Sequence, residues 1–117
     1  MTYAKKEKFP RRFQEISSFA RALSHPARLV ILDLLAKEGK VVSKDICERI
    51  PLSRETVSHH LQELVKAGMI RGEAAGHNVF YLLRANDLLE MENKFHYFLW
   101  ELVGRTITND EYKHILA

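Results

Sequence analysis

Hydrophobic residues recur at steps of three and four along most of this chain, the spacing that places them on one face of an α-helix. This pattern predicts a first helix over residues 9–23. Ser24-His25-Pro26 then interrupts it, because proline disfavours a helical residue before itself but suits the first position of a new helix. A second helix is predicted from 26 to about 38, and its apolar residues are dense enough for a buried central helix: Leu29, Val30, Leu32, Leu34 and Leu35.

The segment 52–68 has the best-marked boundaries in the chain, with Ser53 as a predicted N-cap and Gly68 where a left-handed residue would end the helix. Helical spacing places on the inner stripe of this segment Val57, Leu61, Leu64 and Val65. The opposite, outer stripe consists of Glu55, His59, Gln62 and Lys66. A shorter helix is predicted over 44–50, with Ser43 as its cap, so the two helices form a helix-turn-helix pattern.

Beyond Gly68 the pattern changes to that of β-strands, with strands predicted at 69–74 and 79–83 around a turn at 75–78. A hairpin directly after a helix-turn-helix is the arrangement called a winged helix, in which the hairpin tip can reach a neighbouring groove or phosphate of DNA. The candidate DNA contacts from this wing are Arg71, His77 and Asn78.

A strongly amphipathic helix is predicted over 87–104, capped at Asn86-Asp87 and ended or weakened by Gly104. A last short helix, capped at Thr108-Asn109-Asp110, would carry Tyr112, Ile115 and Leu116. Residues 1–117 are therefore predicted to form one domain, mainly α-helical with a small β-hairpin. Its parts are a helix-turn-helix at about 43–68, a wing at about 69–83, and terminal helices at about 9–23 and 87–104.

The two terminal helices carry more apolar surface than a three-helix core with a hairpin requires. Fully burying one leucine or phenylalanine contributes roughly 1.5 to 3 kcal/mol, so leaving these seams in water would be costly. Packing within one chain is one solution, and a twofold homodimer is the other and the favoured one. The predicted interface consists of Phe9, Phe13, Ile16, Leu88, Met91, Phe95, Phe98, Leu99 and Leu102.

Composition narrows the class of protein only a little. The 117 residues, 46% hydrophobic and 28% charged, suit a single soluble domain. A net charge of +3, from 18 basic and 15 acidic residues, is weak support for an anionic partner. The single cysteine, Cys47, excludes a disulfide framework, and no apolar run has the roughly 18 to 20 residues of a membrane span. A cytoplasmic protein with no membrane partner is expected.

Three motifs together resemble the ArsR family of bacterial winged-helix repressors, over about residues 15–90. They are Ala22-Leu23-Ser24-His25-Pro26-Ala27-Arg28, then Thr56-Val57-Ser58-His59-His60-Leu61, and then Gly76 followed by Val79-Phe80-Tyr81. The resemblance implies a dimer with the terminal helices at its interface, bound to double-stranded DNA at a palindromic operator. It also implies that transcription is blocked until a signal loosens the complex.

Side chains able to read bases and bind phosphates lie along 53–62. An arginine can pair bidentately with guanine and a glutamine can read adenine, while phosphate contacts give salt-dependent affinity. The predicted DNA contacts are Ser53, Arg54, Glu55, Thr56, Ser58, His59 and Gln62, with Arg71, His77 and Asn78 from the wing. Glu55 departs from the family pattern, which favours an uncharged residue there. His60 is expected to pack inside, and the basic run Lys5, Lys6, Lys8, Arg11 and Arg12 to be a solvated tail rather than a set of phosphate contacts.

The two metal-ligand sets best known in the ArsR family are missing, so no metal or other cofactor is expected. Val42-Ser43-Lys44 occupies the position of the paired cysteines. In the last long helix only Asp87 matches a ligand, because the other three positions hold Leu89, Trp100 and Val103. A zinc site needs at least three donor side chains.

Other features leave the signal open. The pairs Glu92 with His96, and Asp110 or Glu111 with His114, are more typical of surface ion pairs than of a metal site. Cys47 is more typical of a small core residue than of a redox switch. An unknown effector, such as an organic ligand near Phe95, Phe98 and Trp100, is an alternative to a partner protein or to simple control by protein abundance.

These observations predict a homodimeric, sequence-specific DNA-binding transcriptional regulator, a repressor without the usual metal sites. The alternative is a winged-helix module that holds another protein and does not bind DNA. An enzyme is not expected, because the chain has no HExxH motif, nucleophile elbow or phosphate-binding loop.

Overall fold

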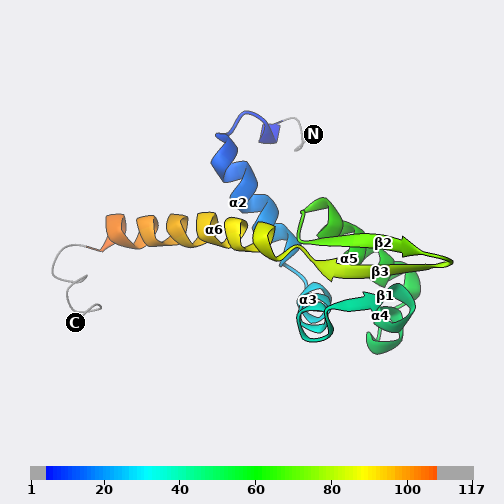
Figure 1. Cartoon of the computed structure of the whole chain (residues 1–117). Helices are drawn as coiled ribbons and strands as arrows, with labels where there is room; N and C mark the ends of the chain where they lie inside the picture. The colour runs from blue at the N-terminus through cyan, green and yellow to red at the C-terminus, as the bar shows by residue number, and fades with distance from the viewer. Residues whose placement is uncertain (1–4, 108–117) are drawn as a thin grey trace.

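The computed structural model describes residues 5–107. Along the chain it contains α2 (Arg11–Ala22), α3 (Pro26–Glu38), β1 (Lys40–Val42), α4 (Ser43–Arg49), α5 (Arg54–Lys66), β2 (Ile70–Ala75), β3 (Asn78–Leu83) and α6 (Ala85–Thr106) (Figure 1). Helices α3, α4 and α5 gather beside the sheet, and the β2–β3 hairpin projects from this body. The predicted winged helix-turn-helix fold is confirmed.

The sheet has one strand more than the sequence pattern predicts. Its order is β1-β3-β2, with both pairings antiparallel, so β3 is the central strand. Strand β1 pairs with β3 through Val41 opposite Tyr81, and the Val41 side chain is buried. The wing is therefore attached to the start of the helix-turn-helix through the sheet.

The core lies where α3, α4 and α5 meet the inner face of the sheet. Its most completely buried side chains are Ile31, Leu35, Ile46, Val57, Leu64, Met69 and Ile70. Two expectations about burial are wrong. Leu29 and Val30 are exposed, so α3 buries only one side, and Val65 of α5 is exposed as well. The side chain that completes the inner stripe of α5 is His60.

Several helix ends differ from their predicted positions. Ser43 is the first residue of α4 instead of its cap, and no side chain caps that helix. Helix α6 begins before Asn86-Asp87, with Arg84 at the N-cap position. It also continues through Gly104, because an exposed glycine weakens a helix without ending it. The short helix predicted after residue 108 lies outside the described residues.

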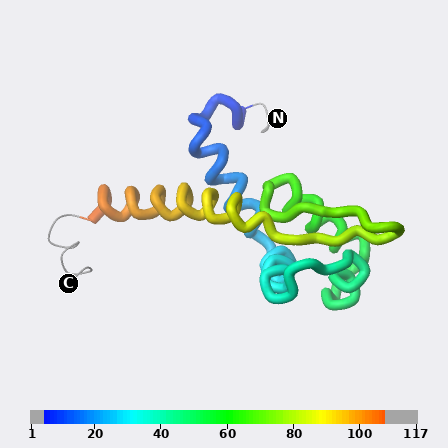
Figure 2. Tube along the Cα trace, viewed as in Figure 1, coloured from blue at the N-terminus to red at the C-terminus, as the bar shows by residue number. Residues whose placement is uncertain are grey.

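Helix α6 runs away from the body, and α2 packs against it (Figure 2). Two aromatic pairs join the helices, with ring centroids 5.8 Å apart for Phe13 and Phe98 and 5.4 Å apart for Phe19 and Phe95. Part of the apolar seam predicted for a dimer is therefore used inside one chain. None of the described helices is long and apolar enough to cross a membrane.

Candidate nucleic-acid interface

The first turn of α5 is stabilised by hydrogen bonds of the Ser53 side chain with Thr56. The Ser53 hydroxyl accepts a hydrogen bond from the Thr56 backbone N–H at 3.2 Å, which confirms Ser53 as the N-cap. The Ser53 and Thr56 hydroxyl oxygens are also 2.8 Å apart. At the other end, Gly68 has φ +77°, the left-handed conformation predicted for it. The exposed side chains of α5 thus project from a helix that is capped at both ends.

The outer face of α5 presents the polar residues that were predicted to contact DNA. Arg54, Glu55, Ser58, His59 and Gln62 are all exposed. Neither Arg54 nor Glu55 has an ion-pair partner within residues 5–107, so the two side chains are not paired with one another in the free protein. The arginine therefore needs no rearrangement of an internal ion pair before it meets a base or phosphate.

The wing carries its predicted contacts at two separate places. Gly76, with φ +63°, and His77 form a two-residue turn between the paired residues Ala75 and Asn78. His77 and Asn78 are exposed at this tip, which projects beyond the rest of the body (Figure 1). The structure thus places two of the three predicted wing contacts together at the exposed tip of the hairpin.

Arg71 lies at the opposite end of the hairpin from the tip. Its strand neighbour Leu82 is also the partner of Lys40, so the two basic residues flank one central strand. Both reach the same carboxylate, with Arg71 Nη2 3.1 Å and Lys40 Nζ 2.9 Å from Glu73. The hydrogen bond and charge of Lys40, with the charge of Arg71, hold the pKa of Glu73 below its ordinary value. The structure does not bring Arg71 together with the tip.

A buried cluster of polar side chains packs against the inner side of α5. The His60 side chain is only 4% exposed, and its Nδ1 accepts a hydrogen bond from Arg28 Nε at 3.1 Å. Arg28 Nη1 also donates to the Arg21 carbonyl at the end of α2, at 3.0 Å. The His25 ring, which caps α3 by accepting from the Ala27 N–H, lies 4.2 Å from the His60 ring between centroids. The expectation that His60 is packed and hydrogen-bonded is confirmed, whereas the role of Arg28 was missed because its partners are distant in the sequence.

This cluster predicts that the protein loses stability as the pH falls below about 6.5, the ordinary histidine pKa. Burial lowers the pKa of His60, and the neighbouring His25, Arg28 and His59 lower it further, against a smaller opposing effect of Glu63. The unfolded chain, with an ordinary histidine pKa of about 6.5, then binds a proton more readily than the folded chain. Stability is fully present above that value and falls as the pH drops toward the folded pKa.

Denaturant unfolding at several pH values and one protein concentration measures this effect. His60→Gln keeps a neutral acceptor but does not titrate, so its stability is expected to vary less with pH than that of the unaltered protein. His96→Gln, an exposed position on α6, is the matched control and is expected to keep the original slope. Equal slopes in all three proteins would show that His60 does not carry the acid sensitivity.

The basic run near the N-terminus is engaged with neighbouring helices. Lys6 Nζ donates to the Ser18 hydroxyl at 3.4 Å, and Arg12 Nη1 lies 3.3 Å from Glu101 of α6. Arg11 is 3.3 Å from Glu15 in the same helix. Lys6 and Arg12 thus contact other parts of the chain instead of forming a free tail, whereas the Arg11 side chain is 92% exposed, as expected for a solvated residue.

The described residues hold no cluster of three or more histidine, cysteine, aspartate or glutamate side chains that could bind a metal. His96 and Glu92 face one another at 3.8 Å as a surface pair. Cys47 is half-buried beside the core. The other pair considered from the sequence, at Asp110 or Glu111 with His114, lies outside the described part of the chain.

Helix α6 carries a second apolar stripe that faces away from α2. Its exposed members are Leu89, Leu99, Trp100 and Val103, of which only Leu99 was in the predicted interface. Phe9 and Leu102 of that set are exposed too, while Ile16, Leu88, Met91, Phe95 and Phe98 are partly buried and Phe13 lies against Phe98. At 100° per residue Leu89, Trp100 and Val103 fall on one side of α6, which marks this stripe in the sequence, but spacing alone does not tell which stripe α2 covers.

Comparisons with known proteins agree with this architecture. A family model described as a helix-turn-helix domain matches residues 23–73. The arsenical resistance operon repressor of Staphylococcus xylosus is 35% identical over 82 residues, which cover 70% of this chain and 77% of that protein. The transcriptional repressor SdpR of Bacillus subtilis is 37% identical over 73 residues, covering 62% of this chain and 80% of that protein.

A solved structure has the same fold. The ArsR-like transcriptional regulator from Rhodococcus sp. RHA1 superimposes with a TM-score of 0.68 over 80% of this chain and 87% of that one, at 24% sequence identity. The fold, the recognition-helix geometry and the extent of identity to the two repressors lead to one assignment. The chain belongs to the ArsR family of winged helix-turn-helix DNA-binding transcriptional regulators.

Proposed function

We propose that this regulator is a homodimeric repressor that places the α5 helix of each protomer in the major groove of a twofold-symmetric operator. The observation that carries the proposal is the outer face of α5, a well-capped helix whose Arg54 is exposed and free of internal ion pairs within residues 5–107. A helix of this kind in the second position of a helix-turn-helix is suited to reading base edges. The chain is a transcriptional regulator and not an enzyme.

The proposed contacts divide by chemistry. Arg54 and Gln62 have the donor geometry for guanine and adenine edges, and His59 lies on the same face. The hydroxyls of Ser53, Thr56 and Ser58 suit phosphates. Glu55 is proposed to accept from cytosine, because a carboxylate placed against phosphates would weaken binding.

The wing adds contacts of its own. His77 and Asn78 at the tip are proposed to reach the flanking minor groove or backbone. Arg71, at the end of the hairpin opposite the tip, is proposed as a weaker phosphate contact, since its guanidinium is already paired with the Glu73 carboxylate. On this proposal the helix-turn-helix occupies about 43–68, the wing about 69–83, and the dimerisation helices about 9–23 and 87–104 of a single domain.

The exposed apolar stripe of α6 is the surface that supports a dimer. It is continuous with Leu102 and lies beside the Phe13–Phe98 contact, so two antiparallel copies of α6 with their α2 helices would cover apolar side chains from both chains. A dimer also matches a palindromic site, because the two α5 helices then meet equivalent half-sites. Acting on chromosomal DNA, such a repressor is expected in the cytoplasm.

The staphylococcal relative is named for arsenical resistance, but this chain is proposed to sense something else. At the start of α4 it has Val42 and Ser43 where soft-metal binding would need thiolates. On α6, Leu89 and Trp100 stand where nitrogen or oxygen ligands would be needed. We therefore propose a regulator without the usual metal sites of its family.

Arg54→Ala is expected to weaken specific operator binding by about 5- to 150-fold, the cost of one bidentate base contact. Fluorescence anisotropy with the DNA upstream of the protein's own gene measures the dissociation constant at several salt concentrations. The unaltered protein should lose affinity steeply as salt rises. Arg105→Ala, which removes an equal charge at the far end of α6, is the matched control and should bind as before.

The alternative, a winged helix that holds another protein, predicts a different result in the same assay. No salt-dependent binding to any DNA, together with a stoichiometric protein partner, would contradict the proposed function. Equal losses of operator affinity in Arg54→Ala and Arg105→Ala would indicate only non-specific electrostatic attraction between protein and DNA. That result would contradict the proposed contact of Arg54 with a base.

A further inference from the structure

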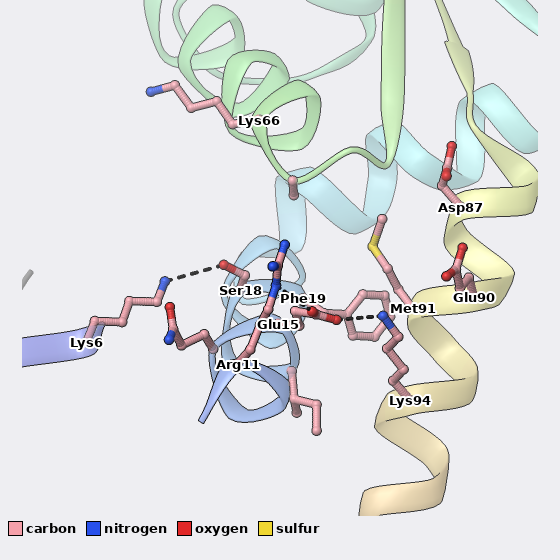
Figure 3. A pocket seen from close by; sticks show the side chains of 13 residues that line it. Lys6, Arg11, Glu15, Ser18, Phe19, Lys66, Asp87, Glu90, Met91 and Lys94 are labelled. Atoms are coloured by element: carbon pink, nitrogen blue, oxygen red, sulfur yellow. Dashed lines mark hydrogen bonds and ion pairs between the residues drawn. The ribbon is translucent and has the colours of Figure 1, made fainter. Parts of the chain in front are cut away.

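A cavity of about 500 Å³ lies between α2, the end of α5 and the first half of α6 (Figure 3). This volume is within the range of small-molecule sites in proteins. Ile16, Phe19 and Met91 give it an apolar floor. Its rim carries the charged residues Lys6, Arg11, Lys66 and Lys94 with Glu15, Asp87 and Glu90. A concave site with an apolar floor and a charged rim is suited to an amphipathic small molecule.

Two of the three carboxylates of this rim, Glu15 and Asp87, are paired with cations. Glu15 is shared by two cations, since it accepts from Lys94 Nζ at 2.6 Å and faces Arg11 Nε at 3.3 Å. Asp87 is paired with Arg84, outside the cavity, at 3.0 Å. The rim therefore has an excess of positive charge.

That excess lies on the side where α2 meets α5. Lys6 donates to the uncharged Ser18 hydroxyl, and Lys66 has no carboxylate partner in the part of the chain that the structure describes. A second hollow, of about 310 Å³, shares Lys6, Ser18, Lys66 and Ala67 with the first. The two lysines therefore border both hollows. In the free protein the Lys66 side chain extends away from Lys6 (Figure 3), so Lys66 must turn toward the cavity for both lysines to meet one anionic group.

We propose that this cavity binds a small organic monocarboxylate with an apolar body. Its carboxylate pairs with Lys6 and Lys66, and its apolar body lies on Phe19 and Met91. A charge-assisted contact of this kind, combined with burial of the apolar body, distinguishes such a ligand from inorganic anions and from amines.

The position of the site links it to the recognition helix. Lys66 is the last residue of α5, and Met91 Cε of α6 lies 3.4 Å from where a Cβ on Gly68 would be. A ligand there touches the end of α5 and the helix proposed for dimerisation at the same time. It is therefore expected to change operator affinity, and operator DNA to change ligand affinity by the same factor. This coupling rests on the proposed function, whereas binding to the cavity does not.

Isothermal titration calorimetry of the full chain with octanoate tests the site. Octanoate is expected to bind saturably, one molecule per chain, and octylamine, of equal length but opposite charge, is expected not to bind. Lys66→Ala should weaken octanoate binding by about five- to tenfold. Lys44→Ala removes an exposed lysine of α4 and is the matched control, with unchanged affinity expected.

Equal binding of octanoate and octylamine, or an equal effect of Lys66→Ala and Lys44→Ala, would overturn the proposed site. Operator affinity measured with and without saturating octanoate tests the coupling separately. A protein that binds octanoate but no DNA would contradict the proposed function and leave the cavity assignment supported. A protein that binds DNA but not octanoate would overturn the cavity assignment alone.

Discussion

Replacing Leu99 with glutamate is expected to convert the proposed dimer to monomers and to weaken operator binding by at least about 100-fold. Leu99 lies on the exposed stripe of α6, where its side chain is 45% exposed in the single chain. In a twofold interface the substitution appears twice, and each carboxylate would be buried without a partner. The two α5 helices would then no longer be joined in one molecule, so binding at one half-site would no longer favour binding at the other.

Leu29→Glu is the matched control, since Leu29 is 49% exposed on the outer side of α3 and outside the proposed interface. Analytical ultracentrifugation reports the oligomeric state of both variants, and circular dichroism shows whether each remains folded. The control should remain dimeric with unchanged operator affinity. A Leu99→Glu protein that is still dimeric and still binds the operator would exclude this face of α6 as the interface.

The recognition helix could be predicted because its signals are local. Ser53 and Gly68 mark its ends, and both have the predicted cap conformations. Its inner stripe was correct at Val57, Leu61 and Leu64 for the same reason, since helical spacing places them on one side. Local chemistry thus determined the element, its limits and its exposed face.

The third strand and the sharing of the apolar seam could not be predicted in this way. Lys40–Val42 is too short to show a strand pattern, and its partner β3 lies about 40 residues further along the chain. Periodicity on α6 shows two apolar stripes but not which of them α2 covers. That choice depends on contacts such as Phe19 with Phe95, which form only when the helices are packed.

Arg28→Ala is expected to lower the free energy of unfolding by about 2 to 4 kcal/mol. Arg28 is only 9% exposed and donates both to His60 Nδ1 and to the Arg21 carbonyl. Its loss would leave the buried His60 Nδ1 without a donor beneath α5, whereas the Arg21 carbonyl would still accept from the Ser24 hydroxyl and backbone N–H. Thermal and urea unfolding measure the change, and each kcal/mol corresponds to roughly 4 °C in Tm for a chain of this size.

Two further variants separate the contribution of the Arg28 hydrogen bonds to stability from the contributions of its charge and volume. Arg21→Ala removes an exposed arginine side chain but keeps the carbonyl that Arg28 binds, so a change below about 0.5 kcal/mol is expected. The double variant Arg28→Ala/His60→Leu should be less destabilised than the sum of the single changes, because it leaves no buried histidine acceptor. Strict additivity would mean that the contact between α3 and α5 contributes nothing. The Ser24–Arg28 motif that marks the family in the sequence would then lack the structural role that this cluster gives it, which is to join the end of α2 to the buried side of α5, the proposed DNA-reading helix.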